Sequence, residues 1–582
     1  MAVDVQDVAQ RHNQLTQDQE SWRPDWKECA RHFLPRKCRI LEQEGDVTNR
    51  GGLRMDLLDS TPIYAMRDLS AGLHGGMTSP ARPWFRLGLQ DEKLEKMSAV
   101  REWLDESQTR MRSLFHRSNF YNAIHTTYAE IGTFGTGFLF EVPDARTMVR
   151  FVPMTVGEYV LDIDESGRVD TVFREMMYTP RQLCQKFGYD KLPSFIQSQY
   201  DKPSTTVPRH RVVHAVYPRA DRDYFKLDGV NKKWASVYYL DMSKTQGNFT
   251  QSKVLLSEGG FDEMPGFGPR WDVTGQDVYG RSPGMDVLPD ARMLQQMTRT
   301  MLRAMHKEAD PPMVSQGSLK HLDMLPGGEN YVDGTTQGQS VYPALNLRPN
   351  VSSTMQGVAA VQNQIKEGLF NNLFRLLMNS DRRQITAKEV AAREEEKLIL
   401  IGPVLERLHD ELFIPLIDRT FNLMTAQDLL PPAPPEIQGM DIKVEFVSLL
   451  AQAQKMVSTA SVDQFMGFIS LHAQVFPELL DIPNADNIGD GYAEYLGVEA
   501  NMLHSEDERK AKRDGRAKDM QAAKLAQTAQ LADTAASAAQ KLGATPVSTP
   551  SGEPNSALQT LLGGLGQNQS VAGPTPMPAA GR

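Results

Sequence analysis

Two long helical patterns flank a short segment that has no helical periodicity, and this arrangement limits the possible folds. The first pattern covers residues 285–308 and follows the Gly- and Pro-rich turn DVYGRSPG at 277–284. The second covers residues 354–378, where apolar side chains recur at spacings of three and four. The segment between them, residues 310–353, is β-like and interrupted by Pro and Gly. Together they predict an antiparallel helical hairpin that holds a small β module at its tip.

A stripe of methionines marks one face of the first helix. Its members recur at every fourth position: Met293, Met297, Met301 and Met305. Periodicity alone favours an ordinary core face, but the other faces carry Arg, Lys and Gln, so the helix is amphipathic and not sealed inside one domain. Methionine is unbranched and repacks readily. We therefore expect the stripe to pack between identical helices that can slide without losing contact.

The remaining patterns predict an α+β fold. Residues 5–34 are expected to form one helix, and STPIYAMRDLSAGL begins another, capped by Ser60 or Thr61. Residues 136–262 alternate apolar and polar residues between turns rich in Gly, Asp and Asn, which is typical of an antiparallel β region. DIKVEFVS at 441–448 indicates one more strand and 449–475 one more helix. A chain of 582 residues is too long for a single core, so about two to four domains are expected.

Prolines and caps set the expected ends of several helices. Pro289 is expected in the first turn of the methionine helix, where its missing N–H costs nothing. A further helix should begin at TAKEV, where Thr386 and Glu389 form a capping box. That helix should bend or break near Gly402–Pro403 and again at Pro415. Beyond 504 come a charge run and an Ala/Gln segment whose order the sequence leaves open, and the tail from 543 has too little apolar surface to order itself.

Charge and cysteine content narrow the class of protein. The net charge is −10, which disfavours a protein whose whole surface binds nucleic acid. Three cysteines, none in a C-x-x-C pair, favour a reducing compartment. The N-terminus lacks the pattern of a signal peptide, and no apolar run is long enough to span a membrane. We expect a soluble intracellular protein.

Motifs of catalytic chemistry find only weak matches. GTFGTG at 132–137 lacks the Lys-Ser/Thr ending of a phosphate-binding loop and is better explained as a helix-to-strand turn. DIDESGRVD at 162–170 starts like a calcium loop, but Phe173 stands where the bidentate Glu is needed, which favours a β-hairpin turn. The twelve histidines are scattered, and neither H-E-x-x-H nor G-x-S-x-G occurs. We expect no catalytic residue, metal site or cofactor.

Several long strings resemble one known family. DVYGRSPGMDVLPDARMLQQM and QITAKEVAAREEEKLILIGPVLERLHDELFIPLIDR look like signature stretches of the portal, or head-to-tail connector, proteins of short-tailed bacteriophages. The N-terminal strings SWRPDWKECARHFLPR and YAEIGTFGTGFLF resemble the same family. The resemblance runs from about residue 10 to 480 and does not cover the tail after 504.

The resemblance implies a ring-forming portal-type fold with an α/β wing, a two-helix stem, a small β-rich clip and a helical crown. The implied ranges are 1–284 for the wing, 285–309 for the first stem helix, 310–353 for the clip, 354–378 for the second stem helix, 379–386 for a tunnel loop, 387–448 for a channel helix that returns to the wing, 449–503 for crown-side helices, and 504–582 for a C-terminal helix or disordered tail. The tunnel loop contains the basic pair of SDRRQ. Arg382, Arg383 and Lys388 are therefore the expected DNA-facing residues.

The family also implies partners. Portals form a ring of twelve subunits at one capsid vertex, and double-stranded DNA is packaged and ejected through the central channel. The resemblance implies a homo-oligomer, sliding non-specific contact with DNA, docking of terminase and later of a tail adaptor, and contact with major capsid and scaffold proteins, without a membrane. The expected location is the virion, with the host cytoplasm during assembly. An acidic channel wall with few basic contacts suits a duplex that must stay mobile.

Two other classes remain as alternatives. Another structural virion protein, such as an internal-core or tail-tube component, would also be oligomeric and acidic, but should lack a helix–β–helix hairpin. A terminase or nuclease would need a Walker motif or a cluster of acidic metal ligands at strand ends, and the sequence contains neither.

Overall fold

The computed structural model contains two compact units, Met1–Val498 and Glu499–Arg582. It describes residues 4–35, 57–91, 94, 97–202, 207–226, 228–242, 253–309, 313–315, 341–343, 351–373, 401–437, 439, 442–446, 465–472, 476, 478–479, 482–496, 506–544, 546–548 and 554–556. Helices and antiparallel sheets occupy separate stretches of the first unit, which confirms the α+β class.

Helices dominate the N-terminal part of the first unit. They are α1 Val5–Gln19, α2 Arg23–Phe33, α3 Thr61–Met77, α5 Ser98–Arg117 and α6 Phe120–Phe134. The prediction of one helix over 5–34 is wrong, because a turn precedes α2 and Pro24, which has no N–H to donate, lies in the first turn of a new helix. Ser60 is the N-cap of α3 but makes no side-chain cap bond. Asp59 Oδ1 instead accepts from the Thr61 N–H at 2.8 Å.

Antiparallel sheets follow, as the alternation in 136–262 predicted. One sheet has the order β3-β2-β9, with β2 Phe138–Asp144, β3 Met148–Met154 and β9 Gly266–Phe267. A five-stranded sheet has the order β4-β5-β6-β7-β8, with β4 Tyr159–Ile163, β5 Val169–Tyr178, β6 His210–Pro218, β7 Trp234–Asp241 and β8 Lys253–Phe261. The DIKVEFVS strand is β12 Ile442–Phe446, and it pairs with β1 Phe85–Leu89, a strand that the sequence patterns missed. GTFGTG and DIDESGRVD are turns, as predicted.

Both faces of the five-stranded sheet are covered by helices. Alternate strand residues point to opposite faces, and Val213 and Tyr239 pack against α1, whereas Val212 and Leu240 pack against α7 Pro180–Phe187 and α8 Ser194–Asp201. The largest core joins α2, α3, α5, α6 and β1 to the three-stranded sheet. Its centre is aromatic, and Trp84 stacks on Phe120 with ring centroids 5.6 Å apart. α6 belongs to this core, and the first helix of the hairpin packs against it.

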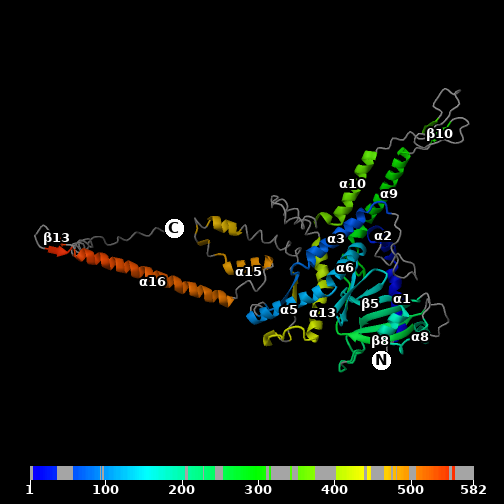
Figure 1. Ribbon diagram of the computed structural model, residues 1–582, viewed down its shortest axis with the longest axis horizontal. Coiled ribbons are helices and arrows are strands. Elements are labelled where there is room, and N and C mark those ends of the chain that lie inside the picture. The colour runs from blue at the N-terminus through cyan, green and yellow to red at the C-terminus, as the bar shows by residue number, and fades with distance from the viewer. Residues whose placement is uncertain are drawn as a thin grey trace, which may run out of the picture. The chain divides into compact units, whose positions relative to one another are not determined.

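The predicted hairpin is present. α9 Pro283–Ala309 and α10 Val351–Gly368 run side by side (Figure 1), and β10 Met313–Ser315 pairs with β11 Val341–Pro343 in the chain between them. Because α9 begins at Pro283, Pro289 lies inside the helix, and the prediction that places it in the first turn is wrong. The prediction of a continuous helix over 354–378 is also wrong. α10 ends at Gly368, since Phe370 has a φ of 57°, and only residues 371–373 are helical before the described part ends.

A second long helix crosses the first unit. Residues 401–408 are α-helical, His409–Phe413 form a π-helical segment, and α13 covers Ile414–Ala426. The predicted break at Gly402–Pro403 does not appear in the helical residues 401–408. The disturbance predicted at Pro415 takes the form of the π segment directly before it. The capping box of Thr386 and Glu389 lies outside the described residues.

The C-terminal segments are mostly helical where they are described. Residues 465–472 and α15 Ala485–Leu496 belong to the first unit, and the second unit contains α16 Glu506–Ala544. Most of the segment left open by the sequence is therefore an α-helix. The expectation that nothing orders after 543 is wrong in one place, because β13 Pro546–Ser548 pairs with β14 Pro554–Ser556. No helix in the described ranges is both long and apolar enough to cross a membrane.

Candidate functional site

Two glycine-rich turns cross at the root of the α9–α10 hairpin. Gly135 has a φ of +79°, and a Cβ built on it would lie 2.0 Å from the carbonyl oxygen of Gly280. A Cβ on Gly280 would in turn lie 2.5 Å from the carbonyl oxygen of Gly135. The Gly280 N–H donates to Thr136 Oγ1 at 2.8 Å. Since a side chain fits at neither glycine, the GTFGTG turn holds the DVYGRSPG turn in place.

Ser282 starts α9 at this crossing. Its Oγ accepts from the Met285 N–H at 2.9 Å and donates to the Thr133 carbonyl at 2.8 Å. Pro283 takes the first helical position, where a missing N–H leaves no bond unmade. A Cβ on Gly284 would lie 3.0 Å from the Gly132 carbonyl oxygen, so the first turn of α9 packs directly on the end of α6. The turn therefore gives α9 a fixed direction out of the body.

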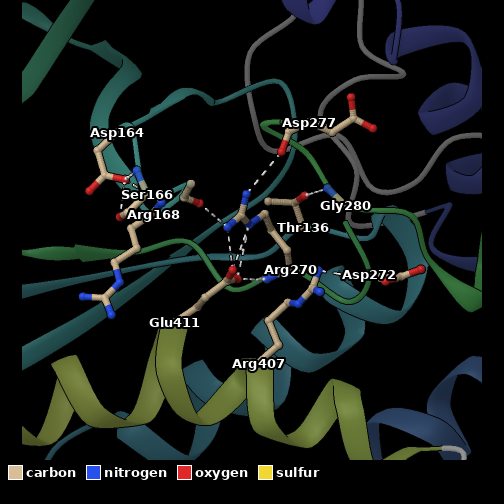
Figure 2. Close-up of polar contacts among 11 residues, drawn as sticks. Thr136, Asp164, Ser166, Arg168, Arg270, Asp272, Asp277, Gly280, Arg407 and Glu411 are labelled. Atoms are coloured by element: carbon tan, nitrogen blue, oxygen red, sulfur yellow. Dashed lines mark hydrogen bonds and ion pairs between the residues drawn. The ribbon is translucent and has the colours of Figure 1, made fainter. Parts of the chain in front are cut away.

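Arg270 joins three other segments beside this crossing (Figure 2). Its side chain is 5% exposed and forms an ion pair with Glu411, with 2.5 Å between Nη2 and Oε1 and 3.1 Å between Nε and Oε1. Nη1 donates to the Asp277 carbonyl at 3.2 Å and Nη2 to the Gly167 carbonyl at 2.6 Å. The Arg270 N–H also donates to Glu411 Oε2 at 2.8 Å. One buried guanidinium thus ties the β4–β5 turn and the loop before α9 to the helix through 401–426.

Glu141 forms a second tie to the same helix. Its side chain on β2 is fully buried, and Oε2 lies 3.5 Å from Arg419 Nε. Thr420 Oγ1 donates to Oε1 at 3.1 Å. Burial raises the pKa of Glu141 to about 7, although the Arg419 charge and the Thr420 hydrogen bond act in the opposite direction. The helix is therefore held by Arg270 within its π segment and by Glu141 of β2 after that segment.

The methionine stripe divides into two kinds of residue. Met297 and Met301 are half-buried and pack on the core of the same unit. The Met297 methyl carbon would lie 3.0 Å from a Cβ on Gly357 of α10. Met293 and Met305 are 42% and 43% exposed. Two members of the stripe thus pack within their own unit, with Met297 next to α10, and only the other two offer a largely free surface.

A basic stripe lies on another face of α9. The sequence patterns predicted no role for it. Arg299, Arg303 and Lys307 are exposed at four-residue spacing. At about 100° per residue, they lie well away from the buried face that contains Leu294. None of the three forms an ion pair with another described residue, whereas Arg292 pairs with Glu28 at 2.9 Å. The four-residue spacing of the bases was the signal that could have revealed the stripe.

The predicted DNA-facing residues Arg382, Arg383 and Lys388 lie outside the described residues, so their role stays a prediction. Among the residues that are described, no group of three or more His, Cys, Asp and Glu side chains is placed to hold a metal ion. An apolar pocket of about 310 Å³ lies between α5, α13 and the Pro-rich segment at residues 430–433. Trp103, Phe421 and Pro431 are in its wall. Among the described residues that line the pocket, Asp428 is the only titratable one.

Comparison with known proteins gives consistent matches over most of the chain. A family model described as "Bacteriophage head to tail connecting protein" matches residues 5–503. The "Probable portal protein" of Bordetella phage BPP-1 is 39% identical over 519 residues, which cover 88% of this chain and 91% of that protein. The "Portal protein" of Salmonella phage epsilon15 is 35% identical over 541 residues, which cover 92% and 95%.

A weaker match occurs among solved structures. A chain in the structure titled "Neck of empty GTA particle computed with C6 symmetry" aligns at 10% identity with a TM-score of 0.26, over 53% of this chain and 64% of that one. At this TM-score the alignment does not establish a shared fold.

Proposed function

The chain belongs to the bacteriophage head-to-tail connecting protein family and is a phage portal protein, and from that premise we propose that twelve copies form a ring at one capsid vertex. The observation that carries the proposal is the α9–α10 hairpin, rooted in a body to which it is fixed by crossing glycine turns. Rings arise when two different surfaces of one subunit meet in a heterologous contact that closes. A portal is a structural component of the head-to-tail connection, and we assign no catalytic residue.

The portal regions follow from the same proposal. The five-stranded sheet and its helices form the wing, α9 and α10 form the stem, and the β10–β11 pair belongs to the clip. The helix through 401–426 is the channel helix that returns to the wing. We assign residues 449–503 to the crown side, as the resemblance implies, and α16 follows them in the sequence.

Contacts between neighbouring stems involve the outer methionines. Met293 and Met305 keep large exposed surfaces in the single chain, and an adaptable apolar side chain suits a contact that must tolerate small shifts. Met297 and Met301, which the sequence analysis placed in the same interface, are already half-buried within their own unit. We therefore assign the interface between subunits mainly to the two outer residues.

DNA passes through the ring along a largely acidic protein with few basic contacts. Arg382, Arg383 and Lys388 remain the candidate DNA contacts of the tunnel loop. The three bases of α9 that form no ion pair with a described residue offer a second candidate set on the stem: Arg299, Arg303 and Lys307. DNA binding becomes tighter as more phosphates are neutralised. A few basic side chains in a protein of net charge −10 therefore favour contact that does not stop the movement of DNA.

The remaining partners are assembly proteins. Terminase docks on the clip during packaging, and a tail adaptor takes its place afterwards. Major capsid and scaffold proteins are the other partners. The protein assembles in the host cytoplasm and remains in the virion at the portal vertex.

Native mass spectrometry and negative-stain imaging of the purified full chain test this proposal. We expect a ring with a central hole and a mass of about 780 kDa, twelve times the 65.1 kDa of one chain. Co-expression with scaffold protein provides a second condition, because some rings assemble only on a scaffold. A compact dimer with nuclease or ATPase activity under both conditions would overturn the proposal.

A further inference from the structure

The helix through residues 401–426 changes its hydrogen-bond register at one place. Over His409–Phe413 the helix is π-helical, and the Ile414 N–H donates to the His409 carbonyl, five residues back. A π segment contains one residue more than an α-helix needs for the same turn. Residues before Leu408 are therefore offset by one position from the regular continuation of α13.

Pro415 accounts for part of this offset. In a regular α-helix residue 415 would donate to the Glu411 carbonyl, but proline has no N–H and its ring clashes with that carbonyl. Proline alone is an insufficient cause, as the same chain demonstrates. Pro289 lies inside α9, and α9 is α-helical throughout its length. Something besides the proline must therefore favour the π register.

Glu411 is the middle residue of the π segment, and its carboxylate is the group that binds Arg270. Arg270 is itself held by the carbonyls of Gly167 and Asp277, so it cannot follow a shift of the helix (Figure 2). Removing the extra residue would turn one side of the helix against the other by about 100° and move it by about 1.5 Å. The carboxylate could not then keep its bonds to both the side chain and the backbone of Arg270.

We propose that the Arg270–Glu411 ion pair selects the π register, and that a fully α-helical register becomes available when the pair opens. The helix is then a two-position element, of the kind in which packed structures switch between discrete arrangements. Residues before the π segment would move, including Arg407, which lies 4.0 Å from Asp272. If the proposed function holds, such a change would alter the direction of the part of the channel helix before the π segment. The Glu141–Arg419 pair would keep the part after it, α13, fixed to the sheet.

Three variants of the full chain test the inference by cryo-EM maps of the helix and by hydrogen exchange of residues 401–426. They are Pro415→Ala, the pair replacement Arg270→Met/Glu411→Met, and the triple variant that combines them. Replacing both ion-pair partners by apolar groups avoids leaving one buried charge alone. Pro289→Ala is the matched control for loss of a proline from a helix, and its register should not change.

We expect Pro415→Ala alone to remain π-helical, because the ion pair is intact. We expect the triple variant to become α-helical, with amide exchange at 409–414 slower by about tenfold as a regular hydrogen bond forms. A π-to-α change in Pro415→Ala alone, or a π segment that persists in the triple variant, would overturn the inference.

If the triple variant does not fold, Glu411→Gln/Pro415→Ala decides the matter, because it keeps the volume of side chain 411 while it removes the charge and one of the two oxygens that accept from Arg270. Slower exchange than in Pro415→Ala supports the inference, and equal exchange contradicts it. Either result leaves the portal assignment intact, because the test concerns the register of one helix within a single subunit.

Discussion

At the scale of single residues, two glycines with the same backbone angle have very different surroundings. Gly135 and Gly167 both have a φ of +79°. A Cβ at Gly135 would collide with the Gly280 carbonyl, whereas nothing lies within 4 Å of a Cβ at Gly167. Comparing the two glycines therefore separates the strain of the backbone angle from the close approach of two segments of the chain.

We predict that Gly135→Ala destabilises the subunit by more than about 3 kcal/mol, because backbone strain and a backbone clash add. Gly167→Ala, which carries only the strain, should cost about 1 kcal/mol. Urea unfolding of the two variants beside the parent chain measures the difference. Equal losses of stability would mean that the crossing of the turns is not a constraint.

Glu141 makes the stability of the subunit depend on pH. Its folded pKa of about 7 lies above the ordinary 4.5, so its contribution is fully present below about pH 4.5 and is lost as the pH rises through 7. Glu141→Gln should flatten this loss, by roughly 2–3 kcal/mol between pH 5 and pH 8. Thermal unfolding of both proteins across this range tests the sign. The exposed Glu165→Gln is the control, and a parent chain whose profile matches that of Glu141→Gln would contradict the prediction.

At the scale of elements, the α9–α10 hairpin separates contacts within a subunit from contacts available to a neighbour. The inner methionines pack on the same unit, and the outer ones are exposed. Helical periodicity places all four on related faces, but it cannot show how far along α9 its partner helix packs. Packing of α10 decides which methionines are covered.

We predict that Met293→Ser/Met305→Ser leaves the isolated subunit within about 0.5 kcal/mol of the parent but lowers the fraction assembled into rings. Met297→Ala should instead lower the stability of the isolated subunit, by about 1–2 kcal/mol, because the Met297 side chain is half-buried. Denaturation and analytical ultracentrifugation measure the two effects. Unchanged ring assembly in the double serine variant would remove the outer methionines from the interface.

At the scale of the whole molecule, the proposal places DNA against a few basic residues of a ring with an acidic net charge. Arg382→Ala/Arg383→Ala should leave ring assembly intact and reduce packaging or retention of DNA, because a phosphate contact is lost at each subunit. The yield of packaged genome measures this. An unchanged yield would exclude the loop from the mechanism.

The same assay separates the loop from the stem. Three basic side chains of α9 form no ion pair with a described residue: Arg299, Arg303 and Lys307. Replacing all three with glutamine tests the stem alone. Arg292→Gln is the matched control, because that arginine is already paired with Glu28 and should contribute little to contact with DNA.

Local sequence patterns were enough to predict most of the individual elements. Periods of two and of three to four residues located the antiparallel region and the two helices of the hairpin, and glycines located the turns at 132–137 and 162–170. These features depend on neighbours close in the chain, so a local pattern is enough to predict them. The portal family was also accessible from the sequence, through the strings that carry the resemblance.

How these elements meet became visible in the folded subunit alone. It placed Gly135 against Gly280, joined Arg270 to Glu411 across 141 residues, and paired β1 with β12. It also turned the predicted disturbance at Pro415 into a π segment and divided the methionine stripe into inner and outer residues. Periodicity specifies which face of an element is apolar. The partner of that face, and the partner of each buried charge, depend on packing between segments that lie far apart in the chain.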